Sequence, residues 1–367
     1  MEGLGSLIGE RVEELDTPCL MVDLDIMEEN IRRMASICRD LQVRWRPHTK
    51  SCKVPALAHK LLEAGAEGIC TAKLAEAEVM AAGGVRDILI TGAVVGQPKV
   101  GRLISLARHF PEIKVVVDSV SNVTELLTAA SSRGVVLNVL LEVNIGQDRC
   151  GVESGEAARE IAQLISESPG LRFRGAQGYE GHLQHIRDLR EREEQCRTAM
   201  EALMVAVKQI EAANIPVDIV TTAGTGTFQI AARFPGITEV QPGSFIFMDT
   251  DYRDCGVPFG NALGVLATVI SKPSRNRAVV DAGMKALSTD AGMAEAKTVS
   301  DLIHLSGGDE HGILKSPEGD IPLEVGQKIE FIPSHCDTTV NLYDWLYGIR
   351  GGLVETVWQV SGGRKTQ

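Results

Sequence analysis

The chain has 367 residues, which predicts about two domains at roughly 150 residues each. Hydrophobic residues make up 44% and charged residues 23%, so the chain can bury a core and is not a disordered protein. A net charge of −12 argues against a nucleic-acid binder or a polybasic membrane-surface protein.

Apolar β-rich runs alternate with segments of helical spacing. Eight runs predict strands, at 43–46, 67–71, 87–91, 113–118, 136–143, 171–177, 217–221 and 237–241. A helix is expected over 26–41, before the first run, and a long charged helix over 188–213. Eight such strand–helix units favour an α/β fold built on a closed (β/α)8 TIM-type barrel, with a doubly wound open sheet as the alternative.

The pattern changes after residue 255. Runs at 262–270, 277–281, 328–332 and 354–358 are β-rich and separated by turn residues, with no clear helix between them. This predicts a second, C-terminal all-β domain. The expected division is a barrel over 24–255 and a β domain over 256–367. The strand-like segment within about 1–23 is expected to be part of the β domain.

The eight cysteines form no CxxC pair, and most lie in apolar runs. This predicts reduced core thiols in a cytoplasmic protein rather than a disulfide scaffold or a four-cysteine zinc site. The start of the chain has neither a basic stretch nor an apolar stretch of a signal peptide, and no apolar run is long enough to span a membrane.

The first predicted barrel strand is followed by His48, Thr49 and Lys50. Function in barrels lies at the carboxyl ends of strands, so Lys50 is placed to form a Schiff base. Desolvation would lower the pKa of its amine and make it a better nucleophile. The alternative is an exposed lysine in a loop.

Two turns of small residues follow the seventh and eighth predicted strands. Loops in these positions are the commonest phosphate site of this architecture, because backbone N–H groups and hydroxyls are available there. The candidate phosphate ligands are Thr222, Gly224, Thr225, Gly226, Gly243 and Ser244. Each turn by itself is also compatible with a plain turn.

The fifth and sixth predicted strands end in further candidates. Arg149 could hydrogen-bond an anionic cofactor group or pair with Asp148. Tyr179 offers a ring for stacking, while His182 and His185 are candidate proton carriers.

In the β domain, His335 and Asp337 flank Cys336. In an extended segment the imidazole and the carboxylate would point to one side and the thiol to the other. Such a pair can hold a divalent metal that keeps several waters, although a structural hydrogen bond is the simpler interpretation.

These features together resemble the D-threonine aldolase and 3-hydroxy-D-aspartate aldolase group of the fold-type III, alanine racemase-like pyridoxal-phosphate enzymes. The resemblance covers essentially the whole chain. The matching segments are RPHTKSCK, DRCGV, GYEGHLQH, GTGTF, QPGSFIFMD, VVDAGMK, DEHGIL, PSHCDTTVNLYDW and VETVW.

The resemblance implies a lyase that cleaves D-β-hydroxy-α-amino acids to glycine and an aldehyde. Lys50 would carry pyridoxal 5'-phosphate, with Arg149 and Tyr179 near its ring and the two small-residue turns at its phosphate. His335 and Asp337 would bind Mn²⁺, Mg²⁺ or Zn²⁺, and His185 would act at the substrate's β-hydroxyl. The resemblance also implies a homodimer.

Two positions depart from the pattern of the group. Ala72 stands where many relatives have a glutamine beside the cofactor, and Ser51-Cys52 follows Lys50 where relatives often have a histidine.

Two other functions stay open. One is a D-serine or D-3-hydroxyaspartate dehydratase on the same scaffold. In those relatives a cysteine tends to stand where this chain has Asp337, which favours the aldolase. The other is a non-catalytic pyridoxal-phosphate carrier, against which the extra β domain argues. The sequence does not decide whether the side chain of the natural substrate ends in a methyl, a phenyl or a carboxylate group.

Overall fold

The computed structural model describes all residues except 1–6, 298, 300 and 318. The chain divides into two compact units. The barrel unit comprises Met34–Lys50, Pro55–Gly243 and Lys365–Gln367, and the sheet unit comprises the chain up to Arg33, Ser51–Val54 and Ser244–Arg364.

The units differ from the expected boundary at residue 255, because the chain leaves the barrel unit earlier. The backbone N–H of Thr250 donates to the carbonyl oxygen of Pro333 at 3.1 Å, and the carboxylate of Asp249 accepts from the backbone N–H of Cys336 at 2.8 Å. These long-range bonds hold the segment after Ser244 in the sheet unit.

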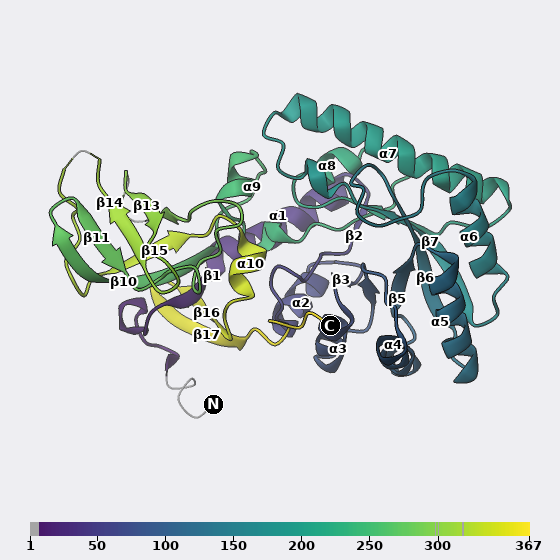
Figure 1. Cartoon of the computed structure of the whole chain (residues 1–367), viewed down its shortest axis with the longest axis horizontal. Coiled ribbons are helices and arrows are strands. Elements are labelled where there is room, and N and C mark those ends of the chain that lie inside the picture. The colour runs from purple at the N-terminus through teal and green to yellow at the C-terminus, as the bar shows by residue number, and fades with distance from the viewer. Residues whose placement is uncertain (1–6, 298, 300, 318) are drawn as a thin grey trace. The chain divides into compact units, whose positions relative to one another are not determined.

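All eight predicted barrel strands are present (Figure 1). They are β2 (Arg44–Trp45), β3 (Ile69–Thr71), β4 (Ile88–Ile90), β5 (Lys114–Val117), β6 (Leu137–Val143), β7 (Leu171–Gly178), β8 (Ile219–Thr222) and β9 (Glu239–Val240). They pair in parallel in the order β2-β9-β8-β7-β6-β5-β4-β3. A parallel bridge between His48 and Cys70 joins the two ends of this order, so the ring is closed and the barrel prediction is confirmed.

Helices follow the strands around the ring (Figure 1). The helices up to the last barrel strand are α1 (Leu24–Asp40), α2 (Pro55–Glu63), α3 (Leu74–Ala82), α4 (Gln97–His109), α5 (Val120–Ser132), α6 (Glu156–Ser166), α7 (Leu189–Ala212) and α8 (Phe228–Ala231). The two helices predicted at 26–41 and 188–213 are α1 and α7. The side chain of Asp188 caps α7 by accepting from the backbone N–H of Glu191. Five strands contribute one buried cluster of apolar side chains, namely Cys70, Leu89, Val116, Leu140 and Ile219.

The sheet unit is built on a nine-stranded sheet. Its strands are β1 (Cys19–Asp23), β10 (Leu263–Ser274), β11 (Arg277–Val280), β12 (Glu295–Ala296), β13 (Ile303–Ser306), β14 (Gly312–Lys315), β15 (Lys328–Ile332), β16 (Trp345–Arg350) and β17 (Leu353–Gln359). The order is β13-β14-β11-β10-β1-β16-β17, and β15 pairs with β10 and β12. β1 lies inside this sheet, antiparallel to β10 and parallel to β16.

The separate C-terminal sheet domain is confirmed, although one short helix, α10 (Cys336–Val340), lies in the region where no clear helix was expected. α9 (Thr250–Asp254) precedes that region. Asp249 accepts from the first backbone N–H of α10 across 87 residues of sequence. A helix terminus stabilised from so far away leaves no local capping signal.

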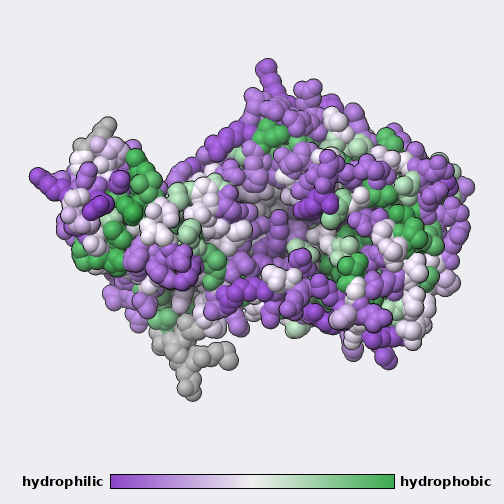
Figure 2. Space-filling view, viewed as in Figure 1, coloured by the Kyte–Doolittle hydropathy of each residue, from purple (hydrophilic) through white to green (hydrophobic). Residues whose placement is uncertain are grey.

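All eight cysteines are free thiols, and seven of them are buried, as the sequence predicted; Cys150 is exposed. Among the described residues, no helix has the length and apolarity needed to cross a bilayer. The face shown in Figure 2 is mostly hydrophilic, consistent with the high net charge.

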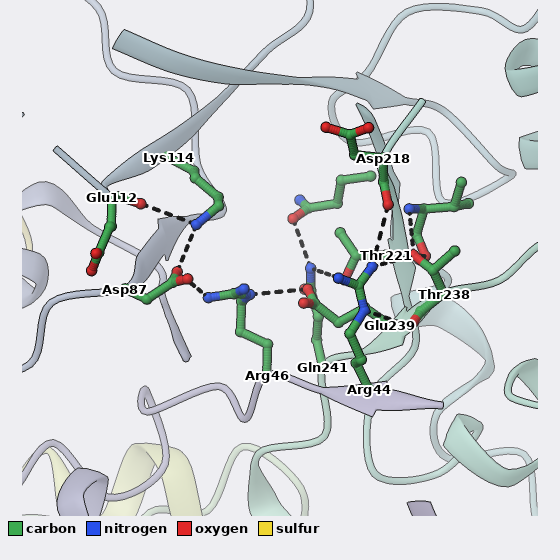
Figure 3. Close-up of polar contacts among 12 residues, drawn as sticks. Arg44, Arg46, Asp87, Glu112, Lys114, Asp218, Thr221, Thr238, Glu239 and Gln241 are labelled. Atoms are coloured by element: carbon green, nitrogen blue, oxygen red, sulfur yellow. Dashed lines mark hydrogen bonds and ion pairs between the residues drawn. The ribbon is translucent and has the colours of Figure 1, made fainter. Parts of the chain in front are cut away.

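A network of charged side chains joins Arg46, which directly follows β2, to Asp87, Lys114 and Glu239 at the amino ends of β4, β5 and β9 (Figure 3). The guanidinium of Arg46, 1% exposed, donates to Glu239 at 3.0 Å and also to Asp87. Lys114 donates to Asp87 at 2.7 Å. Burial opposes the charge on Arg46, but the carboxylates of Glu239 and Asp87 outweigh it and raise its pKa above the usual range. Charges at this end of a barrel contribute to stability rather than chemistry.

Glu239→Ala should therefore destabilise the protein strongly. The substitution leaves the buried Arg46 without one of its two carboxylates, which we expect to lower the free energy of unfolding by about 3–5 kcal/mol. The exposed pair Arg275–Asp320 supplies the control, because Asp320→Ala should change stability little. Urea denaturation of the two variants measures both effects, and equal losses would contradict a structural role for the buried network.

Candidate active site

Lys50 follows β2 at the carboxyl end of the barrel and is held through its backbone. Its N–H donates to Nδ1 of His48 at 3.2 Å. Because Nδ1 accepts, Nε2 of the neutral ring carries the proton and donates to Thr91 Oγ1 at 3.1 Å. Thr91 in turn donates to the carbonyl oxygen of Thr71. His48, which sequence reasoning did not single out, therefore fixes the chain at Lys50.

Arg149 and Tyr179, predicted from different strand ends, are brought together. The guanidinium carbon of Arg149 lies 5.6 Å from the centroid of the Tyr179 ring, a cation–π geometry. Asp148, the alternative partner of Arg149, accepts from the side-chain amide of Asn144 at 2.9 Å. The pair presents a cation and an aromatic ring at the carboxyl ends of β6 and β7.

The first small-residue turn, residues 222–227, is tightly packed; we call it the glycine turn. The backbone N–H of Gly226 donates to Oε1 of Gln184 at 2.9 Å. A Cβ on Gly224 would lie 2.5 Å from Oε1 of Gln184, and one on Gly226 would lie 2.1 Å from the Gln184 carbonyl oxygen. Only glycine fits at Gly226, because the turn approaches the Gln184 backbone so closely, whereas a Cβ on Gly224 would meet the end of the Gln184 side chain. Thr225 is buried in the same turn.

The second small-residue turn is divided between the units. Gly243 ends a segment of the barrel unit, and Ser244 begins one of the sheet unit. The hydroxyl of Ser244 donates to Oδ1 of Asp337 at 3.2 Å. The structure therefore places this predicted phosphate ligand beside a predicted metal ligand.

The extended geometry expected around the two predicted metal ligands is wrong. His335 is the N-cap residue of α10, and Asp337 lies in its first turn. Cys336 does not point away from the pair, since its Sγ lies 3.4 Å from Oδ1 of Asp337. The cause is the capping of α10 by Asp249, which turns the chain into a helix immediately after His335.

Asp290 orients His335, a role that sequence reasoning missed. Nδ1 of His335 donates to Oδ2 of Asp290 at 2.7 Å, and the hydroxyl of Thr338 donates to its Oδ1 at 2.9 Å. A carboxylate on one ring nitrogen directs the other towards a metal in many metal sites. The separation of 45 residues between Asp290 and His335 hides this contact in the sequence.

The electrostatics of this cluster favour a cation. Burial lowers the pKa of His335, but the carboxylates of Asp337, Asp290 and Asp249 outweigh it and raise the pKa overall. Three acidic side chains thus act on one imidazole. The nitrogen and oxygen donors suit Mn²⁺, Mg²⁺ or Zn²⁺, so the residues present fit a divalent metal.

The barrel residues also fit a phosphorylated carbonyl cofactor. Thr71 Oγ1 is buried at the end of β3 and has no hydrogen-bond partner among the described residues, which leaves a polar atom for a bound group. His185 and His182 are both exposed, on the segment around the short 3₁₀ helix Gly181–Leu183 in the barrel unit. Lys50, the Arg149–Tyr179 pair and the glycine turn all follow strand ends of this barrel.

Comparisons with known proteins identify the family. Residues 22–251 match the model of the alanine racemase N-terminal domain, and residues 262–349 match that of a putative serine dehydratase domain. The chain is 37% identical to a 3-hydroxy-D-aspartate aldolase of Paracoccus denitrificans (strain Pd 1222), over 97% of this chain and 94% of that protein. The chain belongs to the D-threonine aldolase and 3-hydroxy-D-aspartate aldolase group of the alanine racemase-like enzymes. Members of this fold family use pyridoxal phosphate.

Two further aldolases extend the comparison. The chain is 37% identical to a D-threonine aldolase of Arthrobacter sp, with 96% of this chain and 94% of that protein covered. It superimposes on the crystal structure of D-threonine aldolase from Filomicrobium marinum with a TM-score of 0.95 and 38% identity, covering 98% and 99% of the two chains.

Dehydratases are also similar to this chain. A D-threo-3-hydroxyaspartate dehydratase of Delftia sp. (strain HT23) is 31% identical over 89% of this chain and 92% of that protein. A mutant of a D-threo-3-hydroxyaspartate dehydratase, solved in its metal-free form, has a TM-score of 0.87, 27% identity and coverage of 95% and 98%.

Glu142, at the end of β6, is a buried carboxyl group that the sequence analysis did not identify. Gln177 donates to its side chain, and Gln241 donates to Gln177 at 2.9 Å. Burial raises the pKa of Glu142 to about 8, although the hydrogen bond from Gln177 and the charge of Arg149 act in the opposite direction. Glu142 therefore keeps its proton at a pH where most carboxyl groups are ionised.

This raised pKa predicts a pH-dependent stability. The folded chain holds a proton on Glu142 that the unfolded chain releases near pH 4.5, so stability should fall as the pH rises from 4.5 to about 8. Glu142→Gln removes the titrating group, so its stability should fall less than that of the wild-type protein over this pH range. Urea midpoints of both proteins across that range measure the difference, and parallel curves would contradict the prediction.

Proposed function

We propose that the chain cleaves D-β-hydroxy-α-amino acids of the D-threonine or 3-hydroxy-D-aspartate type to glycine and an aldehyde, using pyridoxal phosphate and a divalent metal. The observation that carries the proposal is identity of 37% to two curated aldolases along nearly the whole chain. Asp337, where dehydratase relatives tend to have a cysteine, supports the aldolase over the dehydratase.

Most of the residues that would hold the cofactor lie in the barrel unit. The amine of Lys50 would take its aldehyde, and Arg149 and Tyr179 would lie near its ring. The phosphate ligands proposed are those of the two small-residue turns, Thr222, Gly224, Thr225, Gly226, Gly243 and Ser244. When bound, pyridoxal phosphate supplies an electron sink for the Cα–Cβ bond that breaks.

His335 and Asp337 would hold the metal in the sheet unit. Asp290 would keep the His335 ring in the orientation that presents Nε2. Two protein ligands leave the rest of the coordination shell to water and substrate. A bound divalent ion supplies Lewis-acid polarisation of the substrate's hydroxyl.

His185 is the proposed base that takes the β-hydroxyl proton. His185→Ala should slow cleavage about 10²–10⁴-fold, the range typical of general-base catalysis, without preventing cofactor binding. His182→Ala is the matched control, because both histidines are exposed on the same segment. Turnover unchanged in His185→Ala and lost in His182→Ala would transfer the role to His182.

Product analysis distinguishes the candidate reactions. The purified protein should convert D-threonine or one of the D-3-hydroxyaspartate diastereomers to glycine and an aldehyde, measured by chromatography and an aldehyde assay. Ammonia and a keto acid from D-serine or D-3-hydroxyaspartate would indicate the dehydratase. Retention of bound pyridoxal phosphate without turnover of any of these substrates would indicate a carrier.

A homodimer in the cytoplasm is proposed for the assembled enzyme. The strand β13 lies at one edge of the sheet and exposes Ile303 and Leu305, at 47% and 37%. Exposed apolar residues on an edge strand are suited to pairing with another surface. Eight free thiols fit the reducing cytoplasm. Analytical ultracentrifugation of the protein measures the oligomeric state.

A further inference from the structure

The glycine turn is fastened along most of its length to the segment that follows β7. The hydroxyl of Thr222 donates to Oε2 of Glu180 at 2.9 Å, and the hydroxyl of Thr227 donates to Oε1. The backbone N–H of Ala223 also hydrogen-bonds to Glu180. Glu180 is 0% exposed, so these bonds replace its contacts with water completely.

Gln184 makes a second set of bonds to the same turn. Its Nε2 donates to Thr227 Oγ1 at 2.8 Å, while its Oε1 accepts from the backbone N–H of Gly226 at 2.9 Å. Thr227 Oγ1 also accepts from the backbone N–H of Gly224 at 3.3 Å. An amide side chain donates from its nitrogen and accepts at its oxygen at the same time, which a carboxylate or a thioether cannot do.

We propose that Glu180, Gln184 and Thr227, the turn brace, are positioning residues that hold the glycine turn in the shape that receives the cofactor's phosphate. The inference rests on the proposed pyridoxal-phosphate function. The brace explains why both glycine amides donate within the protein and why a Cβ on Gly226 would collide with the Gln184 backbone.

The brace also connects two parts of the proposed site. Tyr179 immediately precedes Glu180, and His185 immediately follows Gln184. The residues that fasten the glycine turn are thus the neighbours of the proposed ring contact and the proposed base.

The test compares the affinities of the full-length, cofactor-free chain for pyridoxal phosphate and for pyridoxal, which lacks the phosphate. The dissociation constant for pyridoxal divided by the dissociation constant for pyridoxal phosphate isolates the contribution of the phosphate. In Gln184→Met this ratio should fall about 10–100-fold, because the turn loses bonds that a buried site cannot replace with water. Affinity for pyridoxal itself should stay nearly unchanged.

Two further comparisons separate positioning from general destabilisation. Gln177→Met removes another buried glutamine that bonds to a buried carboxyl group of the same barrel, Glu142, and it should leave the ratio unchanged. Thr227→Val should lower the ratio, whereas Thr227→Ser keeps the hydroxyl and should restore it. Thermal melting of each variant reports folding independently of the ratio.

The outcomes distinguish the two proposals. A ratio that falls equally in Gln184→Met and Gln177→Met, or stays constant in Gln184→Met and Thr227→Val, would overturn the turn brace. Either of these outcomes leaves the proposed cofactor site intact, provided that the wild-type protein binds pyridoxal phosphate more tightly than pyridoxal. A wild-type chain that binds pyridoxal as tightly as pyridoxal phosphate, or binds neither, would overturn the proposed cofactor site and the inference with it.

Discussion

Lys50→Ala should reduce aldol cleavage by a factor on the order of 10⁵–10⁶, the loss expected when an enzyme's covalent nucleophile is removed. The amine of Lys50 stands at the carboxyl end of the barrel, where its backbone is held by His48. No other group placed in the proposed site offers an amine. Initial rates with D-threonine and D-3-hydroxyaspartate, compared with wild type, measure the loss.

The same amine should be the site of covalent labelling. Borohydride reduction of the pyridoxal-phosphate-loaded protein should leave a phosphopyridoxyl group on the peptide that contains Lys50, detected by mass spectrometry. Lys60→Ala, in the following helix α2, serves as the control and should keep both the label and the activity. A label on any other lysine would contradict the assignment of Lys50.

The barrel could be predicted because its pattern is local. Each strand is a short apolar run, and eight of them in succession suffice to favour closure. Closure itself depends on the bridge between His48 and Cys70, which no local pattern contains. The α10 helix was missed for the same reason, since its cap at Asp249 lies 87 residues away.

The proposed site residues are ones that a strand end or a motif marks in the sequence, as for Lys50 and Arg149. The residues that support them were not found. Glu180 lies 42 residues from Thr222, and Asp290 lies 45 residues from His335. A carboxylate that accepts hydrogen bonds from side chains distant in sequence follows no spacing rule, so these roles emerge only from the folded structure.

Removal of the metal should separate cleavage from cofactor binding. His335 and Asp337 lie in the sheet unit, whereas Lys50 and the glycine turn lie in the barrel unit. A chelator should lower cleavage about 10³–10⁵-fold, which corresponds to several kcal/mol of Lewis-acid stabilisation, and leave the borohydride label on Lys50 intact. Added Mn²⁺ or Mg²⁺ should restore activity, because two protein ligands hold the ion reversibly.

Substitutions at the two neighbouring positions identify the ligand. Asp337→Ala should behave like the chelated protein, since it removes one of two protein ligands. Cys336→Ser should retain metal, because a hydroxyl can donate to Asp337 as the thiol does across 3.4 Å. Calorimetric titration with Mn²⁺ and Zn²⁺ measures metal affinity directly. If Cys336→Ser loses the metal while Asp337→Ala keeps it, the ligand is the thiol. A thiolate-bound zinc and the dehydratase reaction then become the better description of this site.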